Sequence, residues 1–231
     1  MSNSLAFKSL LGLGGVSAVT GAAIGIPKLL SDDKREEHLI SDLIKVKNPE
    51  KRLISSKEVG DSAWKKAWEV YRNENKLASK GKDAFQLLDW NDPILGDISV
   101  SDEANKGLID ICFENSGKRS SLDSQLYRDV LKYCTRDTKI SDLIRDAGKT
   151  VLIKGGDSNQ WKKAWERYRL AHQGSGTDPW TIDKFSENKS KADQPASEDF
   201  QNKCVERLER ASISDVKLID EVTKWCTVEG K

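Results

Sequence analysis

The chain has 231 residues, of which 37% are hydrophobic and 32% are charged, and its formal net charge is +1. A chain of this length can bury a hydrophobic core, and the seven Trp residues argue against a disordered protein. The near-neutral charge argues against broad nucleic-acid binding, which needs a surplus of Lys and Arg to displace counterions from phosphates. We therefore expect a folded body and no nucleic-acid partner.

The N-terminal segment is apolar and sharply bounded. Residues 9–26 carry no charge, and these eighteen residues would span roughly 27 Å as a helix, close to the hydrocarbon thickness of a bilayer. The pattern favours an uncleaved transmembrane anchor within residues 1–30. A cleaved signal peptide and a buried or flexible Gly-rich segment are the alternatives. We expect a single-pass protein of the cell membrane that contacts the bilayer through residues 9–26.

Two features disagree about the side of the membrane on which the body lies. Lys28, Lys34 and Arg35 follow the apolar segment. Only Lys8 and the terminal amine precede it, so the positive-inside rule would keep the body in the cytoplasm. The signal-like position of the segment and the paired cysteines favour an oxidising exterior instead. We expect an extracellular body and keep the cytoplasmic orientation as the alternative.

The rest of the chain is self-similar, with the features in the same order in both copies. The matched pairs are residues 40–44 with 140–144, 64–72 with 161–169, Asp92-Pro93 with Asp178-Pro179, and 132–135 with 224–227. In the second pair, eight of nine positions are identical. Convergence of so many ordered features is improbable, so we expect two tandem repeat units, residues 31–136 and 137–231.

Hydrophobic periodicity predicts several helices in each unit. The first helix is expected to begin after Ser31 in unit one, and to run from near Thr138 to Gly148 in unit two. Each second helix carries an aromatic stripe on one face, formed by Trp64, Trp68 and Tyr71 in unit one and by Trp161, Trp165 and Tyr168 in unit two. These aromatics are interpreted as repeat core, with a ligand-stacking platform and a protein-contact face as alternatives.

Two further helices are expected around the cysteines of each unit. Their predicted ranges are 104–114 and 122–134 in unit one, and 197–211 and 215–226 in unit two. Residues 174–196 are rich in Ser, Lys, Asp, Gly and Pro, which predicts a long loop or linker. Strand signals are confined to short runs such as residues 151–153. The expected fold class is therefore mostly α, with a transmembrane helix and a helical body built from two repeats.

The four cysteines have the same spacing in both units. Cys112 precedes Cys134 by 22 residues, and Cys204 precedes Cys226 by the same number. One disulfide per unit, buried reduced thiols, and a metal or redox role are the possible interpretations. On a straight antiparallel hairpin, Cys204 would face a residue near Glu221, so a disulfide would require crossed helices or a bent helix end.

No motif for catalysis, cofactor binding or metal binding is recognisable in the sequence. His38 and His172 lie in different segments, with no other ligand at metal-binding spacing. Residues 148–150 read Gly-Lys-Thr and resemble the end of a phosphate-binding loop, but the glycine expected five residues earlier is Leu143, within a predicted helix. We therefore expect a protein that is not an enzyme and that has no cofactor and no metal.

The Gly-rich start of the chain, the W-K-x-A-W-x-x-Y helix and the endings Y-C-T and W-C-T resemble the paralogous families of haemotropic mycoplasmas. The resemblance covers most of the chain and is carried by residues 12–25, 64–71, 132–135, 161–168 and 224–227. It implies a variable protein on the membrane of a wall-less bacterium, exposed to a host. It supplies no catalytic residue. Lipoprotein relatives would carry a lipobox cysteine, which this sequence lacks, so no lipid anchor is expected.

These observations favour a non-enzymatic membrane-anchored protein that acts as a surface antigen or interaction protein. Its partner would be a host protein or a second copy of the chain, and the sequence leaves its oligomeric state open. The second hypothesis is a cytoplasm-facing scaffold tethered to the membrane. The third is an enzyme with an unrecognised site.

Overall fold

The computed structural model describes residues 36–90, 94, 96–175 and 178–229. The chain divides into two units, residues 1–33 and 34–231, and the described residues all belong to the second. The expected membrane anchor, residues 9–26, lies outside the described residues. Within the part of the chain that is described, no helix combines the length and the apolar character needed to cross a membrane.

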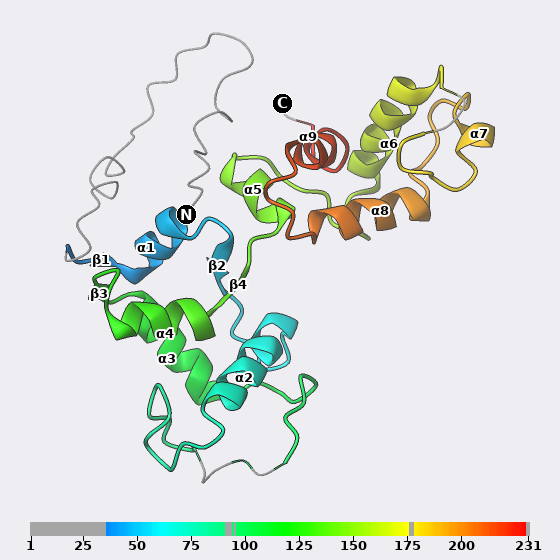
Figure 1. Ribbon diagram of the computed structural model, residues 1–231. Helices are drawn as coiled ribbons and strands as arrows, with labels where there is room; N and C mark the ends of the chain where they lie inside the picture. The colour runs from blue at the N-terminus through cyan, green and yellow to red at the C-terminus, as the bar shows by residue number, and fades with distance from the viewer. Residues whose placement is uncertain (1–35, 91–93, 95, 176–177, 230–231) are drawn as a thin grey trace. The chain divides into compact units, whose positions relative to one another are not determined.

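The body is mostly helical, as the sequence predicts (Figure 1). Residues 38–136, called the first half below, contain the helices α1 (Ile40–Lys47), α2 (Ser62–Glu74), α3 (Lys106–Ser116) and α4 (Gln125–Tyr133). Residues 137–228, called the second half, contain α5 (Ile140–Asp146), α6 (Ser158–His172), α7 (Phe185–Asn188), α8 (Glu198–Leu208) and α9 (Val216–Trp225).

Short strands join distant parts of the first half. β1 (His38–Leu39) pairs antiparallel with β3 (Arg119–Ser120), and β2 (Lys51–Leu53) pairs antiparallel with β4 (Thr135–Asp137). In the second half, an isolated antiparallel bridge joins Val151 to Thr227. Strands of two or three residues are too short to show a hydrophobic alternation, so the sequence pattern misses the first four.

The first helix of each half begins later than predicted. The predicted helix after Ser31 is wrong over residues 36–39, because His38 and Leu39 form β1. α1 begins at Ile40, whose N–H donates to the backbone oxygen of Lys118 at 3.0 Å. In the second half, α5 begins at Ile140, two residues after Thr138, and the Ile140 N–H makes the corresponding bond to the backbone oxygen of Arg210 at 2.9 Å.

Polar side chains cap the other long helices. Asp61 precedes α2 and Asp157 precedes α6, and each carboxylate accepts hydrogen bonds from two backbone amides of the first turn. Asn105 caps α3 and Ser197 caps α8 in the same way, with one amide each. Of the four helices predicted around the cysteines, α3 is shifted by two residues toward the C-terminus, and α4, α8 and α9 are shorter than their predicted ranges.

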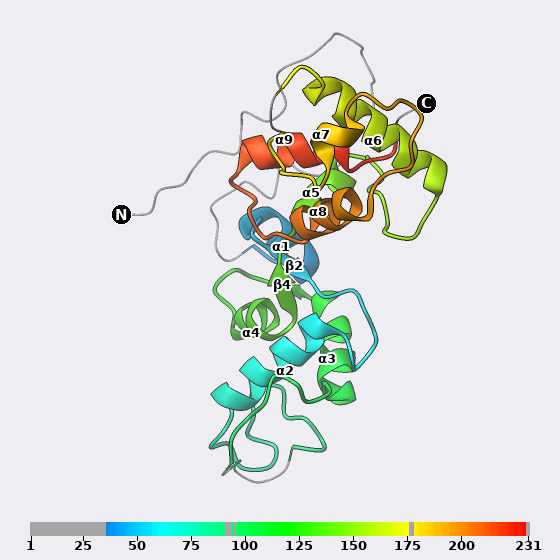
Figure 2. The same cartoon turned by 90° about the vertical axis from the view of Figure 1, so that its right-hand side faces the viewer.

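Each half buries a core between its helices. In the first half, α2 and α3 both contact α4, and in the second half α6 and α8 both contact α9 (Figure 2). Five of the six stripe aromatics are buried, and Trp68 is half-buried. The other side chains with the largest fully buried volumes include Ile40, Ile44, Leu108 and Val130 in the first half, and Ile140, Ile144 and Phe200 in the second.

Apart from the short helix α7, the described residues of segment 174–196 form the predicted loop, but this loop packs against the core and is not a linker. Its described residues include Trp180, Ile182 and Phe185, which are 2–4% exposed and belong to the core of the second half. The short helix α7 begins at Phe185. Composition misleads here because a few buried side chains, spaced between polar residues, hold the segment against the helices.

Candidate functional site

A disulfide closes the corresponding pair of helices in each half. Cys112 and Cys134 are bonded with their Cα atoms 5.4 Å apart, and Cys204 and Cys226 with theirs 5.5 Å apart. Cys134 and Cys226 lie immediately after the last residues of α4 and α9. The backbone has left the helix at these positions, which provides the bent helix end that the spacing on a straight hairpin would require.

A buried Tyr–Asp pair lies at the centre of each core. The Tyr71 hydroxyl donates a hydrogen bond to the Asp83 carboxylate, and the Tyr168 hydroxyl donates to that of Asp178. Each hydroxyl also accepts the backbone N–H of the residue two positions after its Asp. Burial, and then the hydrogen bond to the carboxylate, raise the pKa of both phenols, so both stay protonated.

The two carboxylates organise the same loop in both halves. Asp83 accepts the N–H of Leu87 at 2.9 Å, and Asp178 accepts that of Ile182 at 3.0 Å. Residues 83–87 (D-A-F-Q-L) and 178–182 (D-P-W-T-I) therefore share the pattern Asp-x-aromatic-x-aliphatic. Their fourth residues have positive φ angles of 54° and 51°.

This correspondence corrects the alignment of the two halves. The sequence pairs Asp178-Pro179 with Asp92-Pro93, because the dipeptides are identical. That pairing is wrong, since the contacts of Asp178 are those of Asp83; Asp92 and Pro93 themselves lie outside the described residues. The distance from the stripe Tyr, 12 residues for Asp83 and 10 for Asp178, is the signal that could have identified the pair.

The Trp stripe is occupied by the core. The Trp64 indole N–H donates to the backbone oxygen of Ser56 at 2.7 Å, and that of Trp161 to the oxygen of Ile153 at 2.9 Å. These rings are 0% and 2% exposed, so their faces are not available for stacking with a sugar or a base. Half-buried Trp68 is covered in part by the Arg72 guanidinium, 5.3 Å from the ring centroid.

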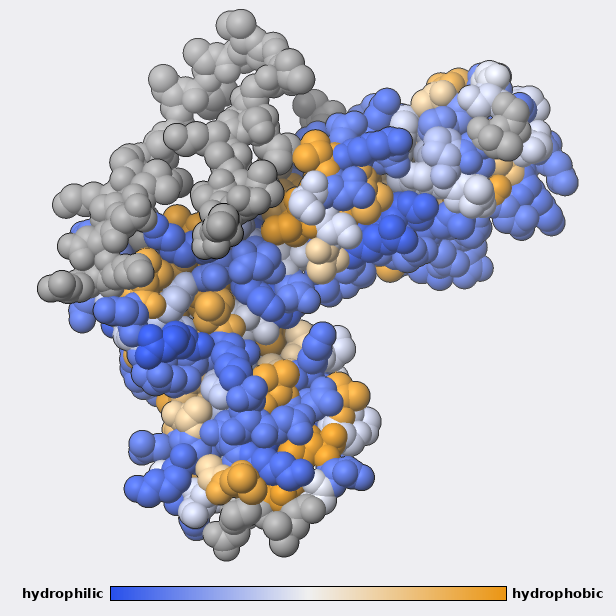
Figure 3. All heavy atoms as spheres, viewed as in Figure 1, coloured by the Kyte–Doolittle hydropathy of each residue, from blue (hydrophilic) through white to orange (hydrophobic). Residues whose placement is uncertain are grey.

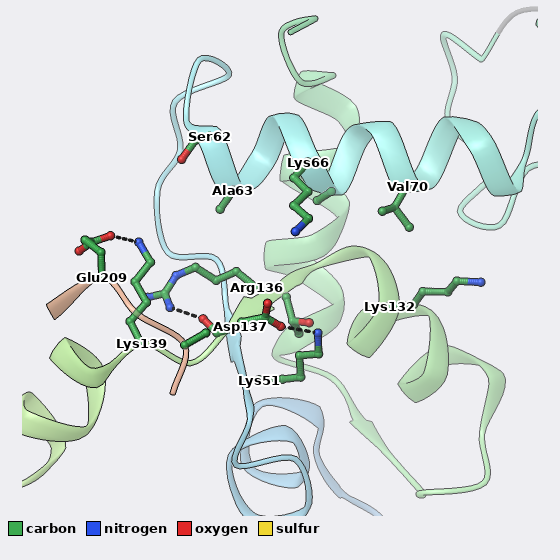
Figure 4. Close-up of a pocket in the computed structure, with 13 residues that line it drawn as sticks. Lys51, Ser62, Ala63, Lys66, Val70, Lys132, Arg136, Asp137, Lys139 and Glu209 are labelled. Carbon is green, nitrogen blue, oxygen red and sulfur yellow. Dashed lines mark hydrogen bonds and ion pairs between the residues drawn. The ribbon is translucent and has the colours of Figure 1, made fainter. Parts of the chain in front are cut away.

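A polar pocket of about 430 Å³ lies beside α2 and β4 and is called the first-half pocket, although Lys139, Glu209 and Ala211 of the second half also line it (Figure 4). Its lining includes the cations Lys51, Lys66, Lys132, Arg136 and Lys139. Figure 4 shows the Lys66 side chain extending from α2 toward Arg136 and Asp137. Carboxylate partners neutralise most of this positive charge.

Four of the five cations have a carboxylate partner. Lys51 lies 2.8 Å from Asp137, and Lys132 lies 2.8 Å from Glu74. Arg136 binds Asp142 through two hydrogen bonds of 2.6 and 2.9 Å, and Lys139 pairs with Glu209. Burial alone would raise the pKa of Asp142, but the bonds from Arg136 and from the Lys139 amide hold it below its usual value.

A second pocket, of about 390 Å³, lies at the corresponding position of the second half and is called the second-half pocket. It is lined by Gly148, Lys149, Thr150, Arg167, Thr223, Lys224, Thr227, Val228 and Glu229. Lys149 lies two residues before the bridge at Val151, as Lys51 lies two residues before Leu53 in β2. Lys224 precedes the buried Trp225 as Lys132 precedes the buried Tyr133.

His172 takes the position of Asn75, four residues after the stripe Tyr. The Asn75 amide bonds the backbone oxygen of Tyr71 at 2.8 Å and accepts the N–H of Ala84. The His172 ring instead packs on Tyr168 and Trp225, and its buried Nε2 has no hydrogen-bond partner among the described residues. Burial lowers the pKa of His172.

The side chains that commonly bind metal ions do not gather in the described part of the chain. On the face drawn in Figure 3, hydrophilic residues dominate and hydrophobic ones form scattered patches. Among the described residues, no group of three or more His, Cys, Asp and Glu side chains could hold a metal ion. Comparisons with family models, with curated proteins and with solved structures find no match to this chain.

Proposed function

We propose that this chain is a non-enzymatic membrane-anchored protein that presents a disulfide-stabilised helical body outside the cell, as an antigen or interaction protein. The observation that carries the proposal is the pair of disulfides, Cys112–Cys134 and Cys204–Cys226. Such bonds persist in oxidising compartments and are rare in the cytosol. Residues 9–26 would be the anchor, on the basis of their length and lack of charge.

The body is proposed to consist of two tandem repeats that arose by duplication. The support is a set of paired contacts: the two disulfides, the two Tyr–Asp pairs, the two indole bonds to a backbone oxygen eight residues earlier, and the first-helix amides bonded to Lys118 and Arg210. Buried contacts of this kind depend on several residues at once. Their recurrence therefore supports common descent more strongly than identity at single positions.

The resemblance to the paralogous families of haemotropic mycoplasmas leads to the same proposal. It implies a variable protein on the membrane of a wall-less bacterium, exposed to a host. The exposed faces of both halves, and not their buried aromatics, would then provide the contact surface.

Protease treatment of cells that express the full chain tests the location. We expect the body to be degraded on intact cells, while a cytoplasmic marker protein survives. The matched control is a variant lacking residues 1–30, which should stay inside and be protected. A full-length body that is degraded only after the membrane is broken would contradict the proposal.

The second candidate is a cytoplasm-facing scaffold tethered by the same anchor. It is favoured by Lys28, Lys34 and Arg35, which follow the apolar segment and would be retained inside by the positive-inside rule. Replacing these three residues with Gln separates the two candidates. If they hold the body inside, protease accessibility on intact cells should appear only in the variant.

A further inference from the structure

We propose that the second-half pocket is a binding site for a phosphate or sulfate ester group. Three of its lining side chains are cations, Lys149, Arg167 and Lys224, whereas Glu229 is its only carboxylate. Oxyanions are bound in proteins chiefly by Lys and Arg side chains that converge on one point. An anion site would operate on either side of a membrane, so this inference goes beyond the proposed function and does not depend on it.

The first-half pocket has more lining cations than the second-half pocket, but carboxylates pair with four of its five, all except Lys66. Lys51 and Lys132 are each paired with a carboxylate, Asp137 and Glu74. Their counterparts Lys149 and Lys224 have no ion pair with any carboxylate in the described residues. The Lys224 ammonium lies 4.5 Å from the centroid of the Trp225 ring, and neither charge is neutralised by a carboxylate.

Two substitutions between the halves change the charge around Lys224 and at the pocket wall, whereas Glu229 takes the place of Asp137 but lies 3.9 Å from Arg167. Glu74 lies three residues after the stripe Tyr71, and the residue three after Tyr168 is Ala171, so Lys224 lacks the partner that Lys132 has. Val70 lines the first-half pocket, and Arg167 lines the second-half pocket at the same position relative to the Tyr. At these two positions the second half lacks the carboxylate and carries a guanidinium, while Val228 takes the place of Arg136 in the pocket lining.

The Arg167 guanidinium is held in place but incompletely bonded. Its Nη2 donates to the backbone oxygen of Thr227 at 2.9 Å. Its Nη1 is buried and has no hydrogen-bond acceptor within the described part of the chain; the Glu229 carboxylate lies 3.9 Å away. A buried donor without an acceptor is unfavourable. An ester oxygen in the pocket would supply a charge-assisted acceptor.

The size of the pocket suits a small ligand. Its volume of about 390 Å³ is near the lower end of small-molecule sites, which run from roughly 300 to 1,000 Å³. Thr150 and Thr223 also line it and bring hydroxyl groups, which bind sugar hydroxyls and ester oxygens equally well. The ligand is therefore a sugar-sized molecule that carries one phosphate or sulfate ester.

Calorimetric titration of the full chain in neutral detergent, at low salt, tests this site. The probes are a sulfated monosaccharide, the corresponding sugar phosphate and the unmodified sugar. We expect at least one ester to bind and the unmodified sugar to bind no better than background. The stronger of the two esters identifies the source of the anion. If neither ester binds up to about 10 mM, a concentration at which contacts worth only roughly 3 kcal/mol would be detected, the proposal is overturned.

Two double variants locate the binding. Lys149→Gln with Lys224→Gln should weaken ester binding by roughly fivefold or more, since each exposed charge contact contributes a factor of up to about five. Lys51→Gln with Lys132→Gln, the matched control in the first-half pocket, should leave the affinity unchanged. Equal losses in the two variants would show non-specific attraction and overturn the proposal.

A single added carboxylate provides a check that removes no contact. Ala171→Glu restores the acidic partner that the first half has at Glu74, and it should reduce ester affinity severalfold. Ala171→Gln has nearly the same size without the charge and should bind as the unmodified protein does. Circular dichroism establishes that both variants are folded. Equal affinities in the Glu and Gln variants would contradict the site.

Discussion

The first and second halves share their buried contacts and differ at the positions next to them. Each contains a disulfide, which joins α3 to the end of α4 in the first half and α8 to the end of α9 in the second. Each also contains a Tyr–Asp pair and a Trp-bearing helix that is capped by an Asp. At the edge of these clusters, Asn75, Glu74 and Val70 of the first half correspond to His172, Ala171 and Arg167 of the second. The shared set holds the fold, and the edge positions give each half its own charge and pH response.

The aromatic stripe offers the largest difference that can be measured between the halves. Trp165 is 2% exposed, whereas Trp68, its counterpart, is half-buried. We expect Trp165→Ala to lower the free energy of unfolding by about 3–5 kcal/mol, the usual range for a buried Trp, and Trp68→Ala to lower it by about half as much. Urea unfolding followed by circular dichroism measures both. Equal losses would show that the two stripes are equivalent.

The two disulfides should contribute equally to the free energy of unfolding. Each closes 22 residues, and a loop of that length corresponds to about 3 kcal/mol of stabilisation through the unfolded chain. Replacing both cysteines of either pair with Ser should therefore lower the free energy of unfolding by about 3 kcal/mol in each case. Thermal unfolding of the two double variants, with and without reductant, checks this. A variant as stable as the unmodified protein would show that its bond is absent.

His172 should make only the second half sensitive to mild acid. Burial lowers its pKa in the folded state, so the unfolded chain binds its proton at higher pH than the folded chain does. Stability is then complete well above the ordinary value of 6.5, and it declines as the pH falls through 6.5 toward the lowered folded pKa. The nearby charges of Asp178 and Glu221 oppose this shift, and that of Lys224 adds to it.

The matched variant for this effect is His172→Asn, which places the first-half residue in the second half. Urea unfolding at pH 7.5 and at pH 5.5 should give a smaller acid loss in the variant than in the unmodified protein. This difference in the free energy of unfolding should be smaller than the loss caused by removing a disulfide. An identical pH dependence in the two proteins would assign the acid sensitivity to other groups.

The surface lysines should have the smallest effects on stability. Lys51 forms an exposed ion pair with Asp137, so Lys51→Gln should cost about 0.2–1 kcal/mol. Lys149 has no such pair within the described residues, and Lys149→Gln should change the free energy of unfolding by less than that. Unfolding at low and high salt measures both, since salt should reduce the cost of the first substitution alone.

The helical part of the fold is predictable because its signals are local. The Trp–Trp–Tyr spacing places three rings on one helix face, and the Asp61 and Asp157 carboxylates cap α2 and α6 through amides at most three residues away. The strands and the packed 178–187 segment are not predictable in this way. They depend on partners such as Arg119 for Leu39, which is 80 residues distant.

The candidate site could not be predicted from the sequence, for the same reason. Gly148-Lys149-Thr150 resembles the end of a phosphate loop, but its neighbours in the pocket, Arg167 and Lys224, come from α6 and α9. The pairing of the halves at Asp83 was also hidden, because two residues are missing from the loop before Asp178. Spacing alone cannot show which lysine has a carboxylate partner.

The central claim is that a disulfide-held body lies outside the cell, and thiol labelling combined with mass analysis of Cys112, Cys134, Cys204 and Cys226 tests it most directly. Intact cells would be labelled with and without a membrane-impermeant reductant, and lysed cells labelled in parallel. The account predicts that all four cysteines label on intact cells only after the impermeant reductant. Free thiols that label only after lysis would contradict it and place a reduced body in the cytoplasm.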